Sequence, residues 1–318
     1  MQSEPSSSLA PSPLVVGLDP RALFDLGAED ELLRTGGPDA LRRHRAEREE
    51  ELLDPGRGLG LVRALGHLDP GAARRVELVL LSRESADTSL RVVSSARRHE
   101  LEIARAVFTG GQPLEPYLAA LRVDLFLCSD EAEVRGALEA GISAGVVCDG
   151  GELAREGESE IRVAFDGDAE LFADDGEAGE PLAADPASRS AGRGAPPASF
   201  ARLLGALAML GSDGRGRGPR LRTALVSSRT GAAQERMLRT LRRFGLQLDE
   251  AFFVGDLPKS EILAAFRPHL AFGEHPRAAA RTLRPVAAVA SPEADEGPRA
   301  GALASPLGRL RFRHGTGA

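Results

Sequence analysis

One pattern occurs twice along this chain, and that internal repeat limits the folds that the chain can adopt. An apolar run at 14–18 ends at Asp19, and a second run at 161–165 ends at Asp166. After each aspartate the same order of segments follows; the matching pairs are 79–83 with 225–229, 107–113 with 252–258, and 118–122 with 263–267. With 318 residues, the chain is long enough for two domains of ordinary size. The sequence therefore predicts two related halves.

The spacing within the repeat supports this interpretation. Asp19 precedes Ser82 by one position more than Asp166 precedes Ser228. Short apolar strings with Gly and Pro recur in any α/β protein, but an agreement of spacing over this length is hard to obtain by accident. In each half, β-prone runs alternate with stretches that suit helices. This alternation indicates a three-layer α/β fold around a mostly parallel sheet.

The order of the segments also suggests where each half begins and ends. We expect an N-terminal half at 14–150 and a C-terminal half at 151–290. Composition predicts disordered tails at 1–13 and 291–318, together with a flexible insertion at 174–197. These segments are rich in small, polar and charged residues, so they cannot bury enough apolar surface to fold by themselves.

Two carboxylates follow the apolar run of the second half. Asp166 and Asp168 are expected at the carboxyl end of a strand, with Gly167 allowing a sharp turn between them. In an open parallel sheet, ligands bind at that edge. Two close carboxylates repel each other unless a cation lies between them, and Mg²⁺ suits such oxygen ligands. By itself the motif is not specific, because a Ca²⁺ loop or the metal-binding Asp-x-Asp of a glycosyltransferase would look the same.

Two further segments place polar groups at the same predicted edge. The apolar run at 221–226 leads into Ser227 and Ser228, whose hydroxyl and backbone N–H groups can hold a phosphate, although an ordinary serine N-cap would look alike. A later apolar run leads through a turn to Lys259 at the start of a helix. Lys259 is the only lysine among 40 Lys and Arg residues. Lysine is a compact point charge that can reach one phosphate oxygen beside a nucleophile, which favours a specific role over chance survival on a surface helix.

This order of motifs resembles the haloacid dehalogenase-like phosphohydrolases. More narrowly, the chain resembles the cytosolic 5′-nucleotidase I family in strings from both halves: Phe165-Asp166-Gly167-Asp168-Ala169-Glu170-Leu171-Phe172, Val226-Ser227-Ser228-Arg229, Pro258-Lys259, Phe266-Arg267-Pro268-His269, Phe108-Thr109-Gly110-Gly111 and Leu125-Phe126-Leu127-Cys128-Ser129-Asp130. The likeness covers about 14–290, and the first of these strings is its most specific part. The resemblance implies Mg²⁺-dependent hydrolysis of nucleoside 5′-monophosphates, AMP among them.

The resemblance also implies a role for each matched residue. Asp166 would be the nucleophile that forms an aspartyl-phosphate, and Asp168 would protonate the leaving ribose oxygen and then activate water. Ser227 would hold a phosphate oxygen, and Lys259 would offset charge on the phosphoryl group and the nucleophile. Mg²⁺ would bind the Asp166 carboxylate, the Asp168 backbone carbonyl and an acid from a fourth motif.

Substrate contacts are expected from both halves. Ser228 and Arg229 follow the phosphate-binding serine and would touch the substrate. In the first half, Thr109, Gly110 and Gly111 are candidates for a base or ribose contact. A glycine pair in a tight turn is the plainer interpretation of that string.

The fourth motif departs from the family pattern. Members that resemble this chain carry Asp-Asp after the strand, whereas here Gly273 and Glu274 occupy those positions. Glu274 is one methylene longer than aspartate and could reach the ion directly or through water. A 5′-nucleotidase is therefore the main prediction, and a nucleotide-binding regulator that has lost turnover through Gly273 is the alternative. A glycosyltransferase is a third possibility, but it gives Lys259 no role.

The first half differs from the second where chemistry would matter. Arg21 stands opposite Asp168, and Leu114 stands opposite Lys259. We therefore expect a degenerate copy that has lost catalysis and that contributes to nucleotide binding or to contacts in a homo-oligomer.

Composition narrows the function classes. A formal net charge of −7 and an aromatic content of 4% without Trp argue against nucleic-acid binding. There is no apolar run of about eighteen residues, so we expect no membrane span, and the first residues fit neither a signal nor a transit peptide. Cys128 and Cys148 are too few for a disulfide framework, which favours a reducing cytoplasm. The stretch at 42–50 mixes both charges, and we interpret it as a solvated helix face; its members are Arg42, Arg43, Arg45, Glu47, Arg48, Glu49 and Glu50.

Overall fold

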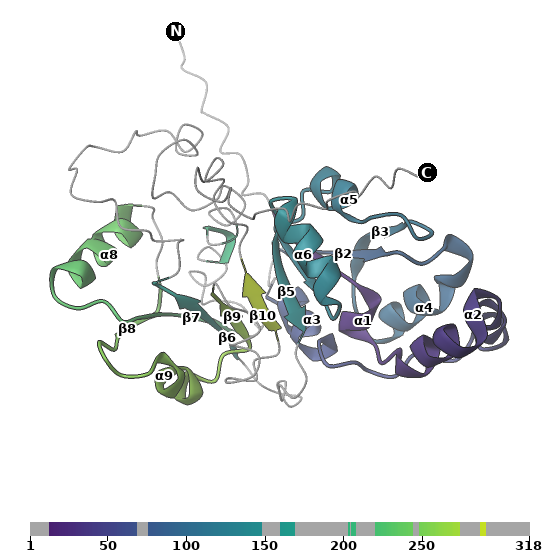
Figure 1. Cartoon of the computed structure of the whole chain (residues 1–318), viewed down its shortest axis with the longest axis horizontal. Coiled ribbons are helices and arrows are strands. Elements are labelled where there is room, and N and C mark those ends of the chain that lie inside the picture. Colours follow the sequence, from purple (N-terminus) through teal and green to yellow (C-terminus); the bar gives the residue numbers. More distant parts are fainter. Residues whose placement is uncertain are drawn as a thin grey trace, which may run out of the picture.

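The computed structural model describes residues 13–68, 76–147, 160–168, 203, 205–207, 220–243, 248–273 and 287–290. Within these ranges ten strands form one sheet with helices packed against it (Figure 1). The predicted insertion, Cys148, Glu274 and the predicted tails apart from residue 13 lie outside the described residues. The expected boundaries of the two halves remain predictions.

The first five strands run parallel to one another in the order β3-β2-β1-β4-β5. They are β1 (Leu14–Leu18), β2 (Val76–Ser82), β3 (Ile103–Phe108), β4 (Leu125–Cys128) and β5 (Ser143–Val147). β1 lies between β2 and β4, and all its residues are buried. Because both of its faces are covered, β1 appears in the sequence as a continuous apolar run.

The last five strands repeat that order as β8-β7-β6-β9-β10. They are β6 (Glu160–Asp166), β7 (Arg220–Ser227), β8 (Glu250–Phe253), β9 (Leu270–Phe272) and β10 (Ala287–Ala290), and they too are mutually parallel. The repeat in the sequence is thus a repeat of topology. The prediction of an α/β fold with a mostly parallel sheet and two related halves is confirmed.

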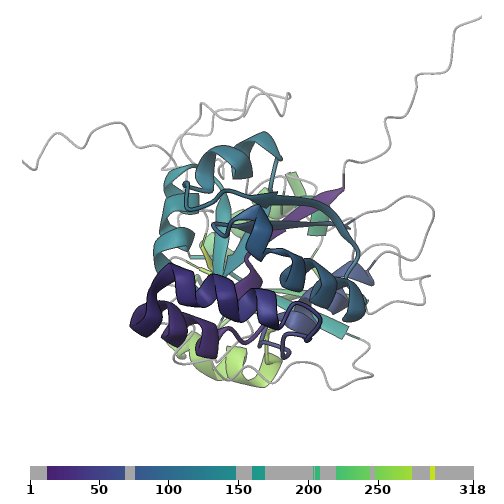
Figure 2. The same ribbon diagram turned by 90° about the vertical axis from the view of Figure 1, so that its right-hand side faces the viewer.

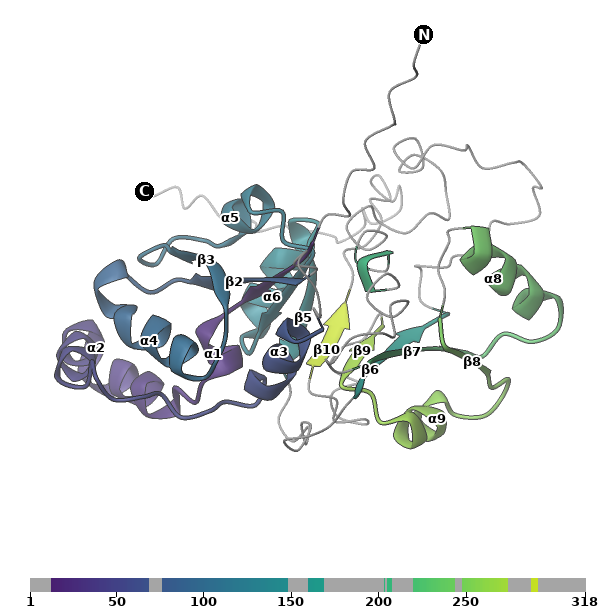
Figure 3. The ribbon, with the colours of Figure 1, turned by 180° about the vertical axis from the view of Figure 1, so that it is seen from behind.

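The two halves join through β5 and β10, which lie side by side in the middle of the sheet (Figure 3). This pair is antiparallel, with Ala287 opposite Val147 and Ala290 opposite Ala144. All strands of one half therefore point opposite to those of the other. As a consequence, the carboxyl ends of β1–β4 and those of β6–β9 lie on opposite edges of the sheet.

Helices cover both faces of the sheet, as a three-layer fold requires. One continuous apolar core holds α3 (Leu59–Gly66), α4 (Leu90–Arg98) and α8 (Ala232–Arg243) against the first face. Two smaller clusters hold α5 (Glu115–Ala120), α6 (Glu131–Glu139) and α9 (Lys259–Phe266) against the second face. Val15 and Val16 of β1 belong to opposite faces, as expected for neighbouring residues of a strand. Among the described residues, no helix has both the length and the apolar character needed to cross a membrane.

A further layer of helices lies over the carboxyl edge of the first half. It contains α1 (Pro20–Leu23), α2 (Gly27–Glu47) and the short 3₁₀ helix η1 (Ala86–Thr88). α2 bends at Gly37, whose φ is 75°, and faces the viewer in Figure 2. The expected solvated face is wrong for Arg45, which is buried and binds Glu29 and Glu84 at 2.7 Å each. Charge spacing along a helix does not reveal which side chains the rest of the chain covers.

Local details of the two halves agree as well. Gly110 and Gly255 both adopt left-handed backbone, with φ of 60° and 58°. Arg122 and Arg267 do the same at the ends of α5 and α9, with φ of 56° and 53°. The repeat therefore extends to individual turns, and both glycines satisfy a conformation that residues with a Cβ adopt at a cost.

One part of the predicted repeat needs a correction. The backbone N–H of Thr109 donates to the carbonyl of Ser82, and the N–H of Val254 donates to the carbonyl of Ser227. Ser82 thus corresponds to Ser227 and not to Ser228, as the spacing suggested. Two adjacent serines leave a sequence match ambiguous by one position, and only the hydrogen bonds between neighbouring segments resolve it.

Asp19 keeps the place of Asp166 but has a different environment. Its Oδ1 accepts the N–H of Arg21 at 2.8 Å, just as Asp166 Oδ1 accepts the N–H of Asp168 at 2.9 Å. Asp19 is only 4% exposed, and burial raises its pKa to about 6 although Arg21 acts in the opposite direction. An ionised Asp19 therefore costs this fold stability at neutral pH.

We predict that Asp19→Asn raises the free energy of unfolding at pH 7. The folded-state pKa lies above the unfolded value, so the wild type loses stability as the pH rises from about 4 to 6, by up to about 3 kcal/mol in total. The variant keeps the acceptor for Arg21 and carries no charge, so it should lack this loss. Urea unfolding at a series of pH values measures both curves. Asp39→Asn, at an exposed position of α2, is the matched control, and parallel pH curves for Asp19→Asn and wild type would contradict the prediction.

Candidate active site

Three secondary-structure ends meet at the carboxyl edge of the second half. Asp166 is the last residue of β6, Ser227 is the last residue of β7, and Lys259 is the first residue of α9. β6 and β7 are adjacent and parallel, with Asp166 opposite Val226. The parallel sheet thus brings together side chains that lie far apart in the sequence.

The turn after β6 fixes both carboxylates. The N–H of Gly167 donates to the carbonyl of Val226 at 2.8 Å, which keeps the turn against β7. A Cβ at Gly167 would lie 3.0 Å from a methyl carbon of Leu225 and 3.2 Å from the Cβ of Ser227. Glycine is therefore needed here for close approach. This tight passage brings the side chain of Asp168 back over the end of β7.

Lys259 links the two carboxylates. Its Nζ lies 2.6 Å from Asp166 Oδ1 and 2.7 Å from Asp168 Oδ2. Burial acts to lower the pKa of Lys259, but the hydrogen bonds to both aspartates outweigh it, and the pKa is raised. The ammonium group is therefore charged at neutral pH and compensates the repulsion between the two carboxylates.

The loop that carries Lys259 is held to the end of β7. The N–H of Val254 donates to the carbonyl of Ser227 at 2.8 Å, and the N–H of Leu257 closes a turn on the carbonyl of Val254 at 3.1 Å. Gly255 provides the left-handed residue of this turn, and Pro258 is the N-cap residue directly before α9. These constraints fix where the lysine side chain begins.

Asp168 accepts hydrogen bonds from a set of donors at the end of β7. Ser227 Oγ donates at 2.5 Å, and Ser228 donates through its N–H at 2.7 Å and through its Oγ at 2.5 Å. Arg229 Nε lies 3.7 Å from the same carboxylate. Burial acts to raise the pKa of Asp168, but hydrogen bonds from Lys259, Ser227 and Ser228 lower it well below its usual range. Asp168 is thus held ionised by donors that would equally suit a phosphate.

The comparison with protein families assigns the chain. The model of the family described as 5′-nucleotidase matches residues 6–295. The chain belongs to the 5′-nucleotidase family. It is 29% identical over 290 residues to human cytosolic 5′-nucleotidase 1B, in an alignment that covers 82% of this chain and 46% of the human protein. The chain therefore spans about half the length of that relative.

Comparison with solved structures adds little to this assignment. Histidinol dehydrogenase from Elizabethkingia anophelis matches 85% of this chain and 51% of its own chain, at 11% identity and a TM-score of 0.20. A similarity at that level carries no argument. The assignment to the 5′-nucleotidase family rests on the family match and on the human relative.

Gly273 occupies the fourth-motif position of this chain, next to Asp166. A Cβ at Gly273 would lie 3.5 Å from the Cβ of Asp166 and 4.0 Å from its Oδ2. Within the described ranges, no three His, Cys, Asp or Glu side chains are placed to hold a metal. Mg²⁺ often binds proteins through one or two carboxylates, with waters and substrate phosphates as the remaining ligands. A donor set of that size is compatible with Asp166 and the backbone carbonyl of Asp168, the two ligands that the resemblance implies within the described residues.

The structure does not bring Thr109, Gly110 and Gly111 to this site. They follow β3, so they lie at the opposite edge of the sheet from Asp166. Thr109 Oγ1 donates to the carbonyl of Gln112 at 2.6 Å, and both glycines have positive φ. These residues form a tight turn, which was the plainer interpretation of the sequence. The repeat predicts equivalent turns, but only the direction of the β5–β10 pair shows that they face away from each other.

Ser228 donates to Asp168 through both its backbone N–H and its Oγ. Its expected contact with the substrate stays a prediction. No sequence signal separates these two roles, because a hydroxyl group donates equally well to a carboxylate and to a phosphate.

We predict that Lys259→Met raises the pKa of Asp168. Loss of the ammonium group removes one hydrogen bond and the nearest positive charge from that carboxylate, so its protonated form becomes less unfavourable. Carboxyl ¹³C chemical shifts followed during a pH titration measure the change. Ser228→Ala, which removes a single hydroxyl donor, should shift the pKa in the same direction by less. An unchanged Asp168 titration in Lys259→Met would show that the contact contributes nothing.

Proposed function

We propose that this 5′-nucleotidase family member hydrolyses nucleoside 5′-monophosphates of the AMP type through an aspartyl-phosphate intermediate, with Mg²⁺ as cofactor. The observation that supports this most is the contact of Lys259 with both Asp166 and Asp168, beside Ser227. Two bare carboxylates would repel a phosphate dianion, whereas a lysine between them attracts it. Such an arrangement is what the resemblance to the haloacid dehalogenase-like phosphohydrolases implies.

Asp166 is the nucleophile of the first step. A carboxylate oxygen of Asp166 forms a bond to phosphorus while the bond from phosphorus to the ribose 5′ oxygen breaks, and that electron pair stays on the ribose oxygen. Asp168 in its protonated form gives its proton to this oxygen, so a neutral nucleoside leaves. Lys259 and Ser227 hold the phosphoryl oxygens in place.

In the second step Asp168 acts as a base, whereas in the first step it acted as an acid. Asp168, now ionised, takes a proton from a water molecule as the water oxygen attacks phosphorus. The bond from phosphorus to Asp166 breaks, and its electron pair returns to the carboxylate. Inorganic phosphate leaves, and the proton gained by Asp168 serves the next turnover.

Substrate binding prepares Asp168 for this work. In the structure the ionised form of Asp168 is stabilised by Lys259, Ser227 and Ser228. Phosphate oxygens accept hydrogen bonds from the same donors. When substrate takes those donors, Asp168 loses the bonds that favour its charge, and its protonated form becomes accessible.

Mg²⁺ would be held by the Asp166 carboxylate, the Asp168 backbone carbonyl and Glu274. When bound, it supplies positive charge that stabilises the charge on the phosphoryl oxygens. The protein's own residues orient the phosphate and carry the proton.

The substrate class and setting are part of the same proposal. The name of the family and that of the human relative both refer to 5′-nucleotides. We also propose a preference for AMP, a cytoplasmic location, assembly into homo-oligomers and the absence of nucleic-acid or membrane partners.

One observation favours a second candidate function. Gly273 brings no carboxylate to Asp166, so metal binding can be too weak for turnover while the phosphate donors remain. The chain would then be a nucleotide-binding regulator.

We expect purified protein to release phosphate from nucleoside 5′-monophosphates only when Mg²⁺ is present. Asp166→Asn should abolish release, because the amide cannot form the aspartyl-phosphate. Lys259→Arg should lose most activity as well, since a planar guanidinium does not replace a point charge that contacts two carboxylates. A malachite-green assay over a panel of nucleotides measures all three proteins.

The outcomes of this assay separate the candidates. Full phosphate release by Lys259→Arg would argue against the proposed role of Lys259 as a point charge between the two carboxylates. No release by the wild type, combined with calorimetric binding of AMP, would establish the regulator instead. Absence of both release and binding would remove both candidates.

We predict that Gly273→Asp strengthens Mg²⁺ binding by about tenfold or more, because it adds a carboxylate beside Asp166 Oδ2. The position accepts a Cβ at ordinary contact distance, so the fold should be kept. Isothermal titration of Mg²⁺ measures the affinity. Gly273→Asn has the same shape without the charge and is the matched control. Equal Mg²⁺ affinities of the two variants would show that a carboxylate at 273 does not reach the ion.

A further inference from the structure

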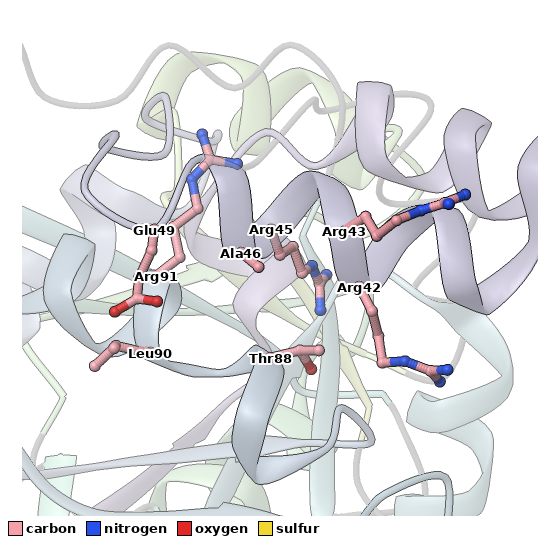
Figure 4. A pocket seen from close by; sticks show the side chains of 8 residues that line it. All are labelled: Arg42, Arg43, Arg45, Ala46, Glu49, Thr88, Leu90 and Arg91. Carbon is pink, nitrogen blue, oxygen red and sulfur yellow. The ribbon is translucent and has the colours of Figure 1, made fainter.

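A pocket of about 370 Å³ lies on the first half, between α2 and the segment that holds η1 and the start of α4 (Figure 4). The residues that line it are Arg42, Arg43, Arg45, Ala46, Glu49, Thr88, Leu90 and Arg91. This half has no lysine or second aspartate at the positions of the Asp166 site. The pocket is therefore a separate feature, which neither the family resemblance nor the catalytic proposal uses.

Positive charge dominates the lining of this pocket. Four of the lining side chains are arginines, and the single lining carboxylate is that of Glu49. Arginine presents planar donors that match the oxygens of a phosphate group, and the protein as a whole is acidic, at −7. An anion thus finds local attraction here that the overall charge does not provide.

Two of the lining arginines are mostly buried and are held by ion pairs. Arg45 and Arg91 are 7% and 12% exposed, and both bind Glu29 at 2.7 Å. Arg45 also binds Glu84 at 2.7 Å, and Arg91 Nε donates to the carbonyl of Glu51 at 2.9 Å. These contacts orient the guanidinium groups before any ligand arrives, so little side-chain freedom is lost on binding.

The other two arginines form the accessible part of the lining. Arg42 projects from α2 on the side of Thr88 in Figure 4. Its partner within the described part of the chain is Asp39, in a pair that is exposed on both sides. Exposed ion pairs contribute little, so a phosphate can replace Asp39 at low cost. Arg43 is exposed on the same helix.

The remaining lining determines what else a ligand carries. Leu90 is 49% exposed, and Ala46 is the second apolar residue of the lining. The volume is within the range typical of small-molecule sites and is larger than a free phosphate requires. The ligand that fits is a phosphate group attached to a small body with an apolar or flat face.

We infer that this pocket is a second ligand site, which binds a small phosphomonoester through Arg42, Arg43 and Arg45 and packs the body of the ligand on Leu90. The site lies over the carboxyl edge of the first half, and the Asp166 site lies at the opposite edge of the sheet. One molecule therefore presents two anion sites that do not overlap. A ligand in the arginine-lined pocket therefore does not occupy the Asp166 site.

Calorimetric titration of the full chain with phenylphosphonate tests this inference. The probe carries a phosphonate and a flat apolar ring, and it has no ester bond to hydrolyse. We expect the double variant Arg42→Gln/Arg43→Gln to lose about tenfold or more in affinity at one site. Arg34→Gln is the matched control, because Arg34 is an exposed arginine of the same helix, pairs with Glu31 and does not line the pocket. It should bind like the wild type.

Two additional titrations test whether the binding occurs at the pocket. Lys259→Met weakens the Asp166 site, so the binding that remains in this variant isolates the pocket, and it should disappear when the two glutamines are added. Inorganic phosphate should bind the pocket several-fold more weakly than phenylphosphonate. Equal binding by the double variant and by Arg34→Gln would overturn the inference. Equal affinity for phosphate and phenylphosphonate would overturn the assignment of an apolar ligand body.

Discussion

Hydrogen bonds between β5 and β10 join two parallel five-stranded units into one sheet, and their antiparallel direction decides where every other feature lies. Had the units met in parallel, their carboxyl edges would have formed one long ligand-binding edge. Because they meet antiparallel, each unit keeps its own edge on its own side of the molecule. The Asp166 site and the arginine-lined pocket can therefore differ in chemistry without interfering with each other.

The carboxyl edges of the two halves share the same backbone structure but carry opposite charges at two equivalent positions. Backbone N–H groups of Glu84 and Arg229 donate to the hydroxyls of Ser82 and Ser227, so Glu84 stands where the second half has Arg229. Arg21 likewise stands where the second half has Asp168. At both positions the first half therefore carries the opposite charge to the second. With Leu114 in place of Lys259, Asp19 has no ammonium partner, and burial raises its pKa. The same strand end thus gives a solvated, lysine-bound carboxylate in one half and a buried, destabilising one in the other.

Sequence reasoning predicts the fold well because its signals are local or periodic. Apolar runs, glycines at turns and the order of motifs are sufficient to predict two α/β halves and to single out Lys259. The contact of Lys259 with Asp166 and Asp168 also follows from a simple rule, that carboxyl ends of neighbouring parallel strands meet. The placement of Thr109 could not be predicted in this way, since it depends on the direction in which two distant edge strands pair. The burial of Arg45 depends on Glu29, which lies on α2 beyond the bend at Gly37, and on Glu84, which follows β2.

By itself, the sequence determined that this protein is a duplicated α/β chain, that one copy keeps two aspartates, a serine and a lysine at strand ends, and that the other copy does not. These properties are fixed by residue type and by order along the chain. The tertiary structure alone decided that the copies face opposite edges, that Ser82 matches Ser227, and that Ser228 binds Asp168. The physical reason is that each of these facts rests on hydrogen bonds between segments far apart in sequence, whose geometry exists only once the sheet has formed.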